Sequence, residues 1–377
     1  MKEDLTNSYN NRQLITWRII ALVLAILLIT IVILYSLGVG WKDNDKKTNN
    51  NGKNAESILT LWEKNSTIFT KLIPYVKDVT DKNSINFIPV EDRIVVFDFD
   101  GTLFCETDPI YFDWSMYTYR VLDDPDYKDI ADDEDIELAK EIRAANIHAL
   151  PSYLEGEHCV RNAYVFRDMT MENYVSYTKD YLNQKAPGYI NMKRGEAFYK
   201  PMLQVIEYLQ ENDFKVFIIT GTERFEVRTI VDGYIDVPES QIIGSVSSIK
   251  ATGQGDKEGI EYQFQKNDTV ILGGRFVIKN VKMNKVSTIT TEIGKQPVLS
   301  FGNSAGDTSM ADYVITNNEY ESLAFMVCCD DEVSENGNKT KAESMYKLCS
   351  QNNWEPISME KDWKTIYGNN VIRNKNN

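Results

Sequence analysis

Three apolar runs, rich in β-branched and aromatic residues, each end in small polar residues: "RIVVFDFD" from Arg93, "FKVFIITGT" from Phe214 and "QPVLSFGNS" from Gln296. A stretch with helical periodicity precedes each run: "AESILTLWEKNSTIFTKLIPYV", "MLQVIEYLQEND" and "VSTITTEIG". Alternating strand and helix patterns predict an α/β fold with a mostly parallel sheet and helices on both faces. In such a sheet the strand ends meet in one crevice, where ligands bind.

The segment between the first two strands, residues 105–200, is rich in Tyr, Asp and Glu. It is far longer than one crossover helix, so we expect it to form a separate, mainly helical cap over the crevice. The sequence therefore predicts a core in two parts, residues 56–104 and 201–377, with the cap inserted between them.

The N-terminal part has a different pattern. Residues 19–40, "IIALVLAILLITIVILYSLGVG", carry no charge and are long enough to cross a bilayer, so we expect a transmembrane anchor between a tail (1–18) and a flexible linker (41–55). A cleaved signal peptide is the alternative. Positive charges on both sides leave the orientation open, but a short tail before one large domain favours a single-pass signal anchor with the domain outside the cytoplasm.

Composition excludes several kinds of site. With 41 Lys and Arg against 56 Asp and Glu, the net charge is −15, so nucleic acid is not an expected partner. The two histidines, His148 and His158, provide no multi-histidine zinc site and little for a histidine-based triad. The five cysteines show no CxxC spacing; a disulfide such as Cys329 with Cys349 is compatible with the sequence but not fixed by it.

The first run continues as "DFDGTLF", which places two carboxylates at the end of a buried strand. Side chains two apart on a strand point the same way, so Asp98 and Asp100 both face the crevice, and Gly101 permits the turn. An ordinary acidic turn is the alternative. Because buried carboxylates are costly without a partner, the pair indicates water or a cation.

The other strand ends favour the cation. Thr220 and Gly221 offer a hydroxyl and an approachable amide, Lys285 a positive charge, and Asn303 with Asp307 further oxygen atoms. Close carboxylates with more hard oxygens and no histidine describe a Mg²⁺ site. A hydroxyl, amides and a lysine beside it describe a cradle for phosphoryl oxygens.

Together these residues resemble the haloacid dehalogenase superfamily of phosphohydrolases. "DFDGT" is similar to its first motif, Thr220 in "FIITGT" to its second, Lys285 in "MNKVSTI" to its third and "FGNSAGD" to its fourth. The resemblance covers residues 55–367 and is closest to the phosphoserine-phosphatase-like branch, including exported bacterial members with stretches like "FIPVEDRI", "YKPM" and "KDWKT". It implies a Rossmann-like, doubly wound parallel sheet with a helical cap inserted after the first motif.

The resemblance also implies roles. Asp98 would attack phosphorus and form an aspartyl-phosphate, and Asp100 would protonate the leaving oxygen and then activate water. Thr220, the Gly221 amide and Lys285 would hold the phosphoryl oxygens.

The implied Mg²⁺ ligands are Asp98, the main-chain carbonyl of Asp100, Asn303 and Asp307. Asn303 departs from the carboxylate that is common in the family, so we expect Asp307 to carry the charge and Asn303 mainly orientation. Where the exported members carry paired histidines, this chain has Cys328 and Cys329.

The expected function is Mg²⁺-dependent hydrolysis of a small phosphorylated metabolite. Glu106 and Arg224 are weaker candidates for substrate contact. The aromatic stretch "YFDWSMYTYR", residues 111–120, is either cap core or a cage for a cationic head group such as phosphocholine. Two alternatives stay open: a membrane-tethered, non-catalytic binding protein on this fold, and a phosphotransferase.

Overall fold

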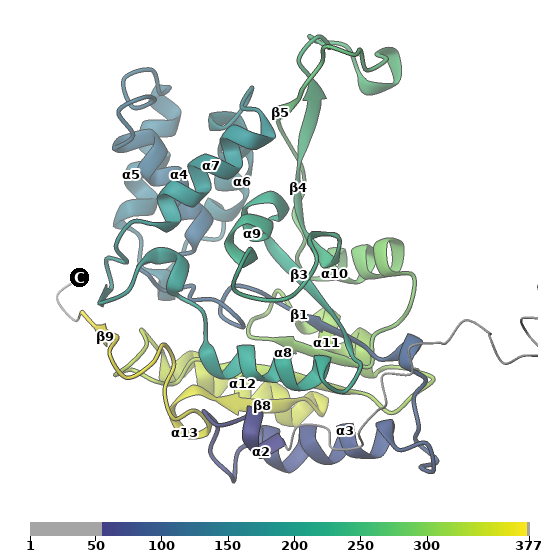
Figure 1. The fold of residues 1–377 in the computed structure, drawn as a ribbon. Helices are drawn as coiled ribbons and strands as arrows, with labels where there is room; N and C mark the ends of the chain where they lie inside the picture. The colour runs from purple at the N-terminus through teal and green to yellow at the C-terminus, as the bar shows by residue number, and fades with distance from the viewer. Residues whose placement is uncertain (1–54, 375–377) are drawn as a thin grey trace, which may run out of the picture. The chain divides into compact units, whose positions relative to one another are not determined.

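The centre of the molecule is a seven-stranded sheet, seen in the computed structural model, which describes residues 55–374 (Figure 1). Its strands lie in the order β5-β4-β3-β1-β6-β7-β8. Their bounds are β1 Ile94–Phe97, β3 Lys215–Glu223, β4 Ile242–Ala251, β5 Val270–Ile278, β6 Leu299–Gly302, β7 Leu323–Cys328 and β8 Glu355–Ser358. All neighbouring pairs are parallel except β4 and β5, which are antiparallel. The predicted α/β class is confirmed.

Strand β1 is buried on both faces, which explains its unbroken apolar sequence. Val95 and Phe97 belong to the large core on one face, whereas Ile94 and Val96 belong to a smaller cluster on the other. Phe97 stacks on Phe301 of β6 with ring centroids 4.5 Å apart. This packing fixes the carboxyl ends of β1 and β6 side by side.

Helices cover both faces of the sheet. Those of the core are α2 Ala55–Ile58, α3 Ile73–Thr80, α8 Lys200–Gln210, α9 Arg224–Val231, α10 Met283–Thr288, α11 Thr308–Ile315, α12 Lys339–Asn352 and α13 Met359–Asp362. Apolar residues of α3 and α8 pack on the side of Val95 and Phe97. On the other side, α11 contributes Met310 and Val314 to the cluster of Ile94 and Val96.

Four further helices lie between β1 and β3 in the chain, in the segment for which the sequence predicts a cap: α4 Phe112–Leu122, α5 Asp133–Ala144, α6 Leu154–Val165 and α7 Met171–Leu182 (Figure 1). They belong to the same compact unit as the sheet. Aromatic rings hold them together, with Trp114 stacked on His158 at 4.8 Å and Phe112 against Tyr181 at 5.4 Å. We call α4–α7 the cap helices.

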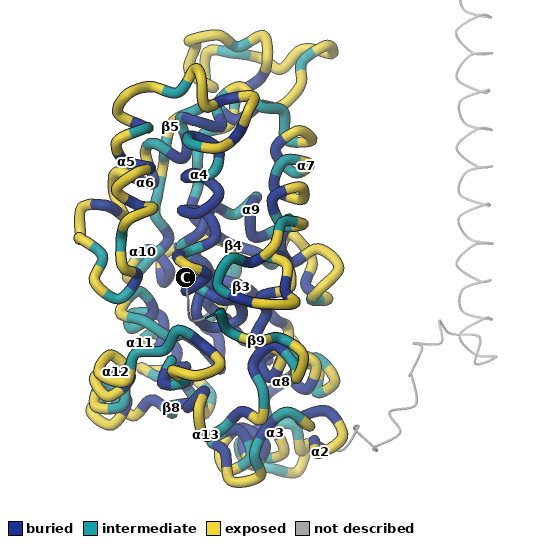
Figure 2. The backbone as a smooth tube through the Cα atoms, turned by 90° about the vertical axis from the view of Figure 1, so that its left-hand side faces the viewer, coloured by how far each residue is buried: buried dark blue, intermediate teal, exposed yellow. Residues whose placement is uncertain are grey.

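Two of the connections between the cap region and the rest of the fold involve strands. Strand β2 (Tyr189–Ile190), which follows α7, pairs antiparallel with β9 (Ile372–Arg373) near the C-terminus. The β4–β5 hairpin extends beyond the sheet, and there the Asp168 amide, between α6 and α7, donates to the Leu272 carbonyl at 2.8 Å. The hairpin's far end is mostly exposed, whereas the interior between helices and sheet is buried (Figure 2).

Two further expectations concerned a transmembrane anchor and a disulfide bond. The predicted anchor, residues 19–40, lies outside the described residues; among residues 55–374 no helix has the length and apolar character needed to cross a bilayer. All five cysteines are free thiols, so Cys329 and Cys349 are not joined. Cys349 of α12 packs in the same cluster as Cys328, and the next residue along the strand, Cys329, belongs to a different cluster, because successive strand residues face opposite sides.

Candidate active site

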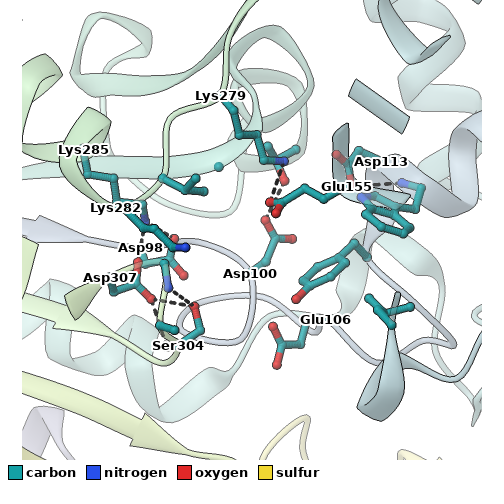
Figure 3. A pocket seen from close by; sticks show the side chains of 18 of the residues that line it. Asp98, Asp100, Glu106, Asp113, Glu155, Lys279, Lys282, Lys285, Ser304 and Asp307 are labelled. Carbon is teal, nitrogen blue, oxygen red and sulfur yellow. Dashed lines mark hydrogen bonds and ion pairs between the residues drawn. The ribbon is translucent and has the colours of Figure 1, made fainter. Parts of the chain in front are cut away.

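A cavity of about 480 Å³ lies where the strand ends meet the cap helices (Figure 3). Its lining residues come from the last residues of β3, from the segments after β1, β5 and β6 and from the cap region: Asp98, Asp100, Glu106, Tyr111, Asp113, Trp114, Leu150, Pro151, Ser152, Glu155, Gly221, Thr222, Lys279, Val281, Lys282, Lys285, Ser304, Ala305, Gly306 and Asp307. The crevice predicted from the polar strand ends is therefore present, and the predicted cap region contributes one wall.

Three predicted residues meet at the floor of this cavity. Lys285 Nζ lies 2.5 Å from Asp98 Oδ1 and 2.6 Å from Asp307 Oδ1, and its side chain is 1% exposed (Figure 3). Of the other lysines nearby in sequence, Lys295 pairs with Asp92 instead. The structure thus selects Lys285 as the cation between the two carboxylates.

The loop after β6 is built around Asp307. Asp307 Oδ2 accepts hydrogen bonds from the Asn303 amide (3.0 Å), the Ser304 amide (3.1 Å) and Ser304 Oγ (3.2 Å). A Cβ at Gly302 would lie 2.5 Å from Asp307 Cβ, so the carboxylate can reach this position only because residue 302 is glycine. One Asp307 oxygen therefore organises the loop, and the other faces Lys285.

Asp100 is held by a residue that the sequence interpretation missed. Thr222 Oγ1 donates to Asp100 Oδ2 at 2.7 Å, while Asp100 Oδ1 is buried and makes no hydrogen bond to any residue that the structure describes. Burial, reinforced by the charge of Asp113, raises the pKa of Asp100 to about 7. Asp100 can therefore carry a proton near neutral pH and present the free oxygen to a ligand.

Thr220 lies next to this interaction but is not among the residues that line the cavity. It is fully buried, and its hydroxyl accepts a hydrogen bond from the Thr222 amide at 3.0 Å. Gly221 and Thr222 line the cavity. Because residues two apart on a strand share a face, the second threonine of "FIITGT" could have been noticed from the sequence; the role predicted for Thr220 stays a prediction.

Asp98, the expected nucleophile, is also perturbed. Burial and then the neighbouring Asp307 raise the pKa of Asp98 to about 7, although Lys285 acts in the opposite direction. Keeping Asp98 ionised therefore depends on positive charge at the floor of the cavity.

Asn303 occupies a tight position beside the first motif. Gly101 has φ +75°, and a Cβ there would lie 1.8 Å from Asn303 Nδ2 and 2.8 Å from Glu106 Cδ, so neither the backbone nor the space admits a larger residue. Asn303 Oδ1 is buried and unpartnered among residues 55–374. Burial raises the pKa of Glu106 to about 8, although Asn303 hydrogen bonding lowers it.

These residues fit a Mg²⁺ ion in their donor chemistry. Within the described part of the chain, no three His, Cys, Asp or Glu side chains form a metal cluster. The predicted set does not require one, because it combines the carboxylates of Asp98 and Asp307 with a main-chain carbonyl and the Asn303 amide, and Mg²⁺ retains several waters. The unpartnered Asn303 Oδ1 is the kind of hard oxygen that such a site uses.

The cap-side wall combines aromatic and charged groups. Of the aromatic stretch 111–120, Tyr111 and Trp114 line the cavity, and Phe112 and Tyr117 do not. Trp114 also belongs to the hydrophobic core together with Phe112 and Tyr117, and Tyr111 packs against it. Lys279 Nζ lies 3.7 Å from Glu155 Oε1 across this wall (Figure 3). Burial acts to lower the pKa of Lys279, but nearby Cys159 and carboxylates raise it above its usual value, so this lysine remains charged.

The predicted and observed cavity residues also differ at Arg224 and Lys282. Arg224 does not line the cavity: its guanidinium pairs with Glu292 at 3.0 Å and donates to the Gly244 carbonyl at 3.3 Å, so the structure does not bring it to a substrate. Lys282, not predicted as a site residue, lines the cavity with a backbone φ of +54°, a conformation unusual for a non-glycine residue.

Comparisons with known proteins give distant likenesses. No protein-family model and no curated protein matches the chain. Among solved structures, a functionally unknown protein from Anaerococcus prevotii has a TM-score of 0.48 at 12% identity, covering 81% of this chain and 96% of its own. Cytosolic 5'-nucleotidase IIIB, solved with cytidine, has 0.46 at 10% (78% and 88% covered). A phosphoserine phosphohydrolase-like protein from Francisella tularensis has 0.36 at 12% (69% and 99%). The candidate function therefore rests on the chain's own residues.

Proposed function

We propose that this protein is a Mg²⁺-dependent phosphomonoester hydrolase that acts through an aspartyl-phosphate. The observation that carries the proposal is the convergence of Asp98 and Asp307 on Lys285, at 2.5 and 2.6 Å, in a cavity where Asp100 presents a free, buried oxygen. A nucleophile, a cation for phosphoryl oxygens and a proton carrier are thus within one cavity.

The reaction proceeds in two steps. Asp98 attacks phosphorus, the bond from phosphorus to the ester oxygen breaks, and Asp100 gives its proton to that oxygen. Water then attacks the phosphorus of the aspartyl-phosphate, Asp100 takes a proton from the water, and the bond to Asp98 breaks, which releases phosphate.

The remaining groups stabilise charge. Lys285 and the Gly221 amide hold the phosphoryl oxygens, with Thr220 contributing through the loop that it supports. Asp98, the Asp100 main-chain carbonyl, Asn303 and Asp307 would hold Mg²⁺, which when bound offsets the negative charge of the phosphoryl group.

The substrate in this proposal is a small phosphorylated metabolite. Tyr111 and Trp114 line the wall together with the carboxyl group of Asp113, which supports a cationic head group. Charged Lys279 on the same wall disfavours one. Hydrolysis rates for a panel of phosphomonoesters with cationic, neutral and anionic leaving groups show whether the site prefers a cationic head group. Equal rates for all three would exclude a cage for cations.

Phosphate release by the full-length chain tests the activity. Inorganic phosphate released from 4-nitrophenyl phosphate should require Mg²⁺ and stop with a chelator. No release from any ester of the panel would contradict the proposal and favour the non-catalytic binding protein. Transfer of the phosphoryl group to added glycerol in place of water would favour the phosphotransferase.

We also propose that residues 19–40 anchor the chain in a membrane with the catalytic domain outside the cytoplasm. The support is the length of the uncharged apolar run. The full-length chain should resist alkaline extraction from membranes and be digested by protease added to intact cells; release into the soluble fraction would contradict the anchor.

A further inference from the structure

A second cavity, of about 350 Å³, adjoins the candidate active site between the cap region and the core. The two cavities share four lining residues: Glu106, Tyr111, Ser304 and Ala305. Glu106 follows the first motif and Ser304 donates to Asp307, so the shared wall is part of the candidate catalytic loops. A ligand that extends past this wall would touch both cavities.

The far side of the second cavity is apolar. Val327 lies at the end of β7, Ala342 and Met345 on α12, and Ile147 in the 3₁₀ turn Ile147–Ala149 of the cap region. All four are less than 9% exposed, so they are held by the surrounding core. An apolar cavity of this size gains little from water, whereas an apolar ligand group would make dispersion contacts with its walls.

Two polar side chains with unpartnered atoms also line this cavity. Asn303 Oδ1 and His148 Nε2 are both buried, and neither has a hydrogen-bond partner among the residues that the structure describes. Burial, followed by the charge of Lys341, lowers the pKa of His148, so its imidazole is neutral. These atoms can pair with one or two uncharged polar groups of a ligand.

Lys341 and Glu106 are the side chains with a full charge-bearing group, apart from His148, that line the cavity. Lys341, on the cavity wall, donates to the Ile147 carbonyl at 3.4 Å and so links core to cap region across it. Glu106 is the carboxyl on the opposite, shared wall, and most of the remaining lining is neutral. Because Lys341 is exposed to solvent, an uncharged ligand body can occupy the cavity without removing this charge from water.

We propose that this second cavity binds the body of the leaving group, and that the preferred substrates are phosphomonoesters of alcohols with an uncharged apolar ring or chain that carries one or two hydrogen-bonding groups. This rests on the proposed function, since the phosphoryl group then lies beside Asp98 while the leaving group passes between Glu106 and Ser304. The cavity's volume lies within the range of small-molecule sites, and its apolar lining with few polar atoms is typical of them.

Matched substitutions on α12 test this. Ser344 is exposed and lines the second cavity, so Ser344→Trp should obstruct it without disturbing the core. Glu343 is also exposed but does not line the cavity, so Glu343→Trp is the control. For 2-naphthyl phosphate, Ser344→Trp should lower kcat/KM about 10-fold or more, mainly through KM, and for ethyl phosphate leave it within about twofold. Glu343→Trp should change neither.

Equal losses for both esters, or no loss for 2-naphthyl phosphate in Ser344→Trp, would overturn the assignment. Calorimetric binding of 2-naphthol to the full-length chain separates this from the proposed function, because it needs no turnover. Binding that Ser344→Trp abolishes and Glu343→Trp preserves supports the subsite even if no ester is hydrolysed; absence of binding to the unsubstituted chain contradicts it.

Discussion

Two groups of buried carboxylates in this molecule are stabilised in opposite ways. At the candidate active site, Asp98 and Asp307 share the charge of Lys285, and Asp100 keeps an oxygen without a partner. At the base of the cap region, the carboxylate of fully buried Glu335 accepts hydrogen bonds, among residues 55–374, from neutral donors only: the hydroxyls of Thr107, Tyr189 and Tyr367, the Asn336 amide and the Cys105 thiol.

The difference separates a structural carboxylate from a reactive one. Thr107 and Tyr189 lie on the two connections between core and cap helices, so Glu335 joins both to the C-terminal region. Its two oxygens are both used by the fold. In Asp100, by contrast, one oxygen accepts a hydrogen bond from Thr222, and the other is buried without a partner and can contact a ligand.

Among the substitutions of these carboxylates, Asp98→Asn should cause the largest loss of activity. Asp98→Asn keeps the shape of the side chain and leaves Lys285 paired with Asp307, so the fold should persist while the nucleophile is lost. Turnover should fall at least about 10⁴-fold, measured as phosphate release. Beryllium fluoride with Mg²⁺ should bind the unsubstituted chain as an aspartyl-phosphate mimic and fail to bind Asp98→Asn. Retained activity in the variant would exclude the covalent mechanism.

Asp100→Asn removes the free oxygen that sets this residue apart from Glu335. Loss of a general acid and base should lower the rate about 10² to 10⁴-fold for alkyl phosphates. An ester with a good leaving group should still form the phosphoenzyme, which then hydrolyses slowly, so a burst of released alcohol is expected in rapid-mixing measurements. Normal turnover of alkyl esters would show that Asp100 is not the proton carrier.

Substitutions of Asp307 and Asn303 test which of the two residues supplies the negative charge that binds Mg²⁺. Asp307→Asn keeps acceptors for the Ser304 loop but removes the charge, so the Mg²⁺ concentration for half-maximal phosphate release should rise about 10 to 100-fold. Asn303→Ala should raise it less, because an amide supplies orientation and no charge. An unchanged midpoint in Asp307→Asn would contradict the ligand set, and circular dichroism of both variants checks that each is folded.

The sequence predicted the parts of the site that are local and failed where contacts are distant. Asp98 and Asp100 follow from alternation within one strand, and Lys285 follows from its match to a motif. Alternation along β3 could have indicated Thr222 as a site residue, but its contact with Asp100 could not be predicted, because it forms through the parallel pairing of β1 with β3. The position of Arg224 outside the cavity lining was not foreseen, because its pairing with Glu292, 68 positions away, cannot be inferred from spacing.

The fold shows the same division. Strand and helix alternation predicted the α/β core, and the long insertion predicted helices between β1 and β3. The antiparallel β4–β5 hairpin and the pairing of β2 with β9 were not predicted, because the first contains glycine and polar residues in place of a clear apolar period and the second is only two residues long.

Thr222→Val removes the hydroxyl that donates a hydrogen bond to Asp100 Oδ2. Its hydroxyl lowers the pKa of Asp100, so removing it should raise that pKa further. Asp100 must be protonated in the first step, and the falling limb of kcat/KM should therefore move to higher pH, with kcat about 10-fold lower. Thr220→Val, whose hydroxyl does not contact Asp100, is the control; an equal shift there would assign the effect to the loop as a whole.

The smallest expected effect on activity is at Glu335. In Glu335→Gln an amide NH₂ replaces one of two oxygens that are surrounded by donors, so the free energy of unfolding should fall by about 1 to 3 kcal/mol. The phosphate-release rate of the folded protein should change little, because no oxygen of Glu335 lines either cavity. Urea denaturation gives the stability, and Glu332→Gln, at an exposed position three residues away, controls for loss of one charge. Glu335→Gln could instead lower turnover as strongly as Asp100→Asn while the stability stays constant. A carboxylate whose two oxygens both accept hydrogen bonds from the protein would then not be purely structural in this fold.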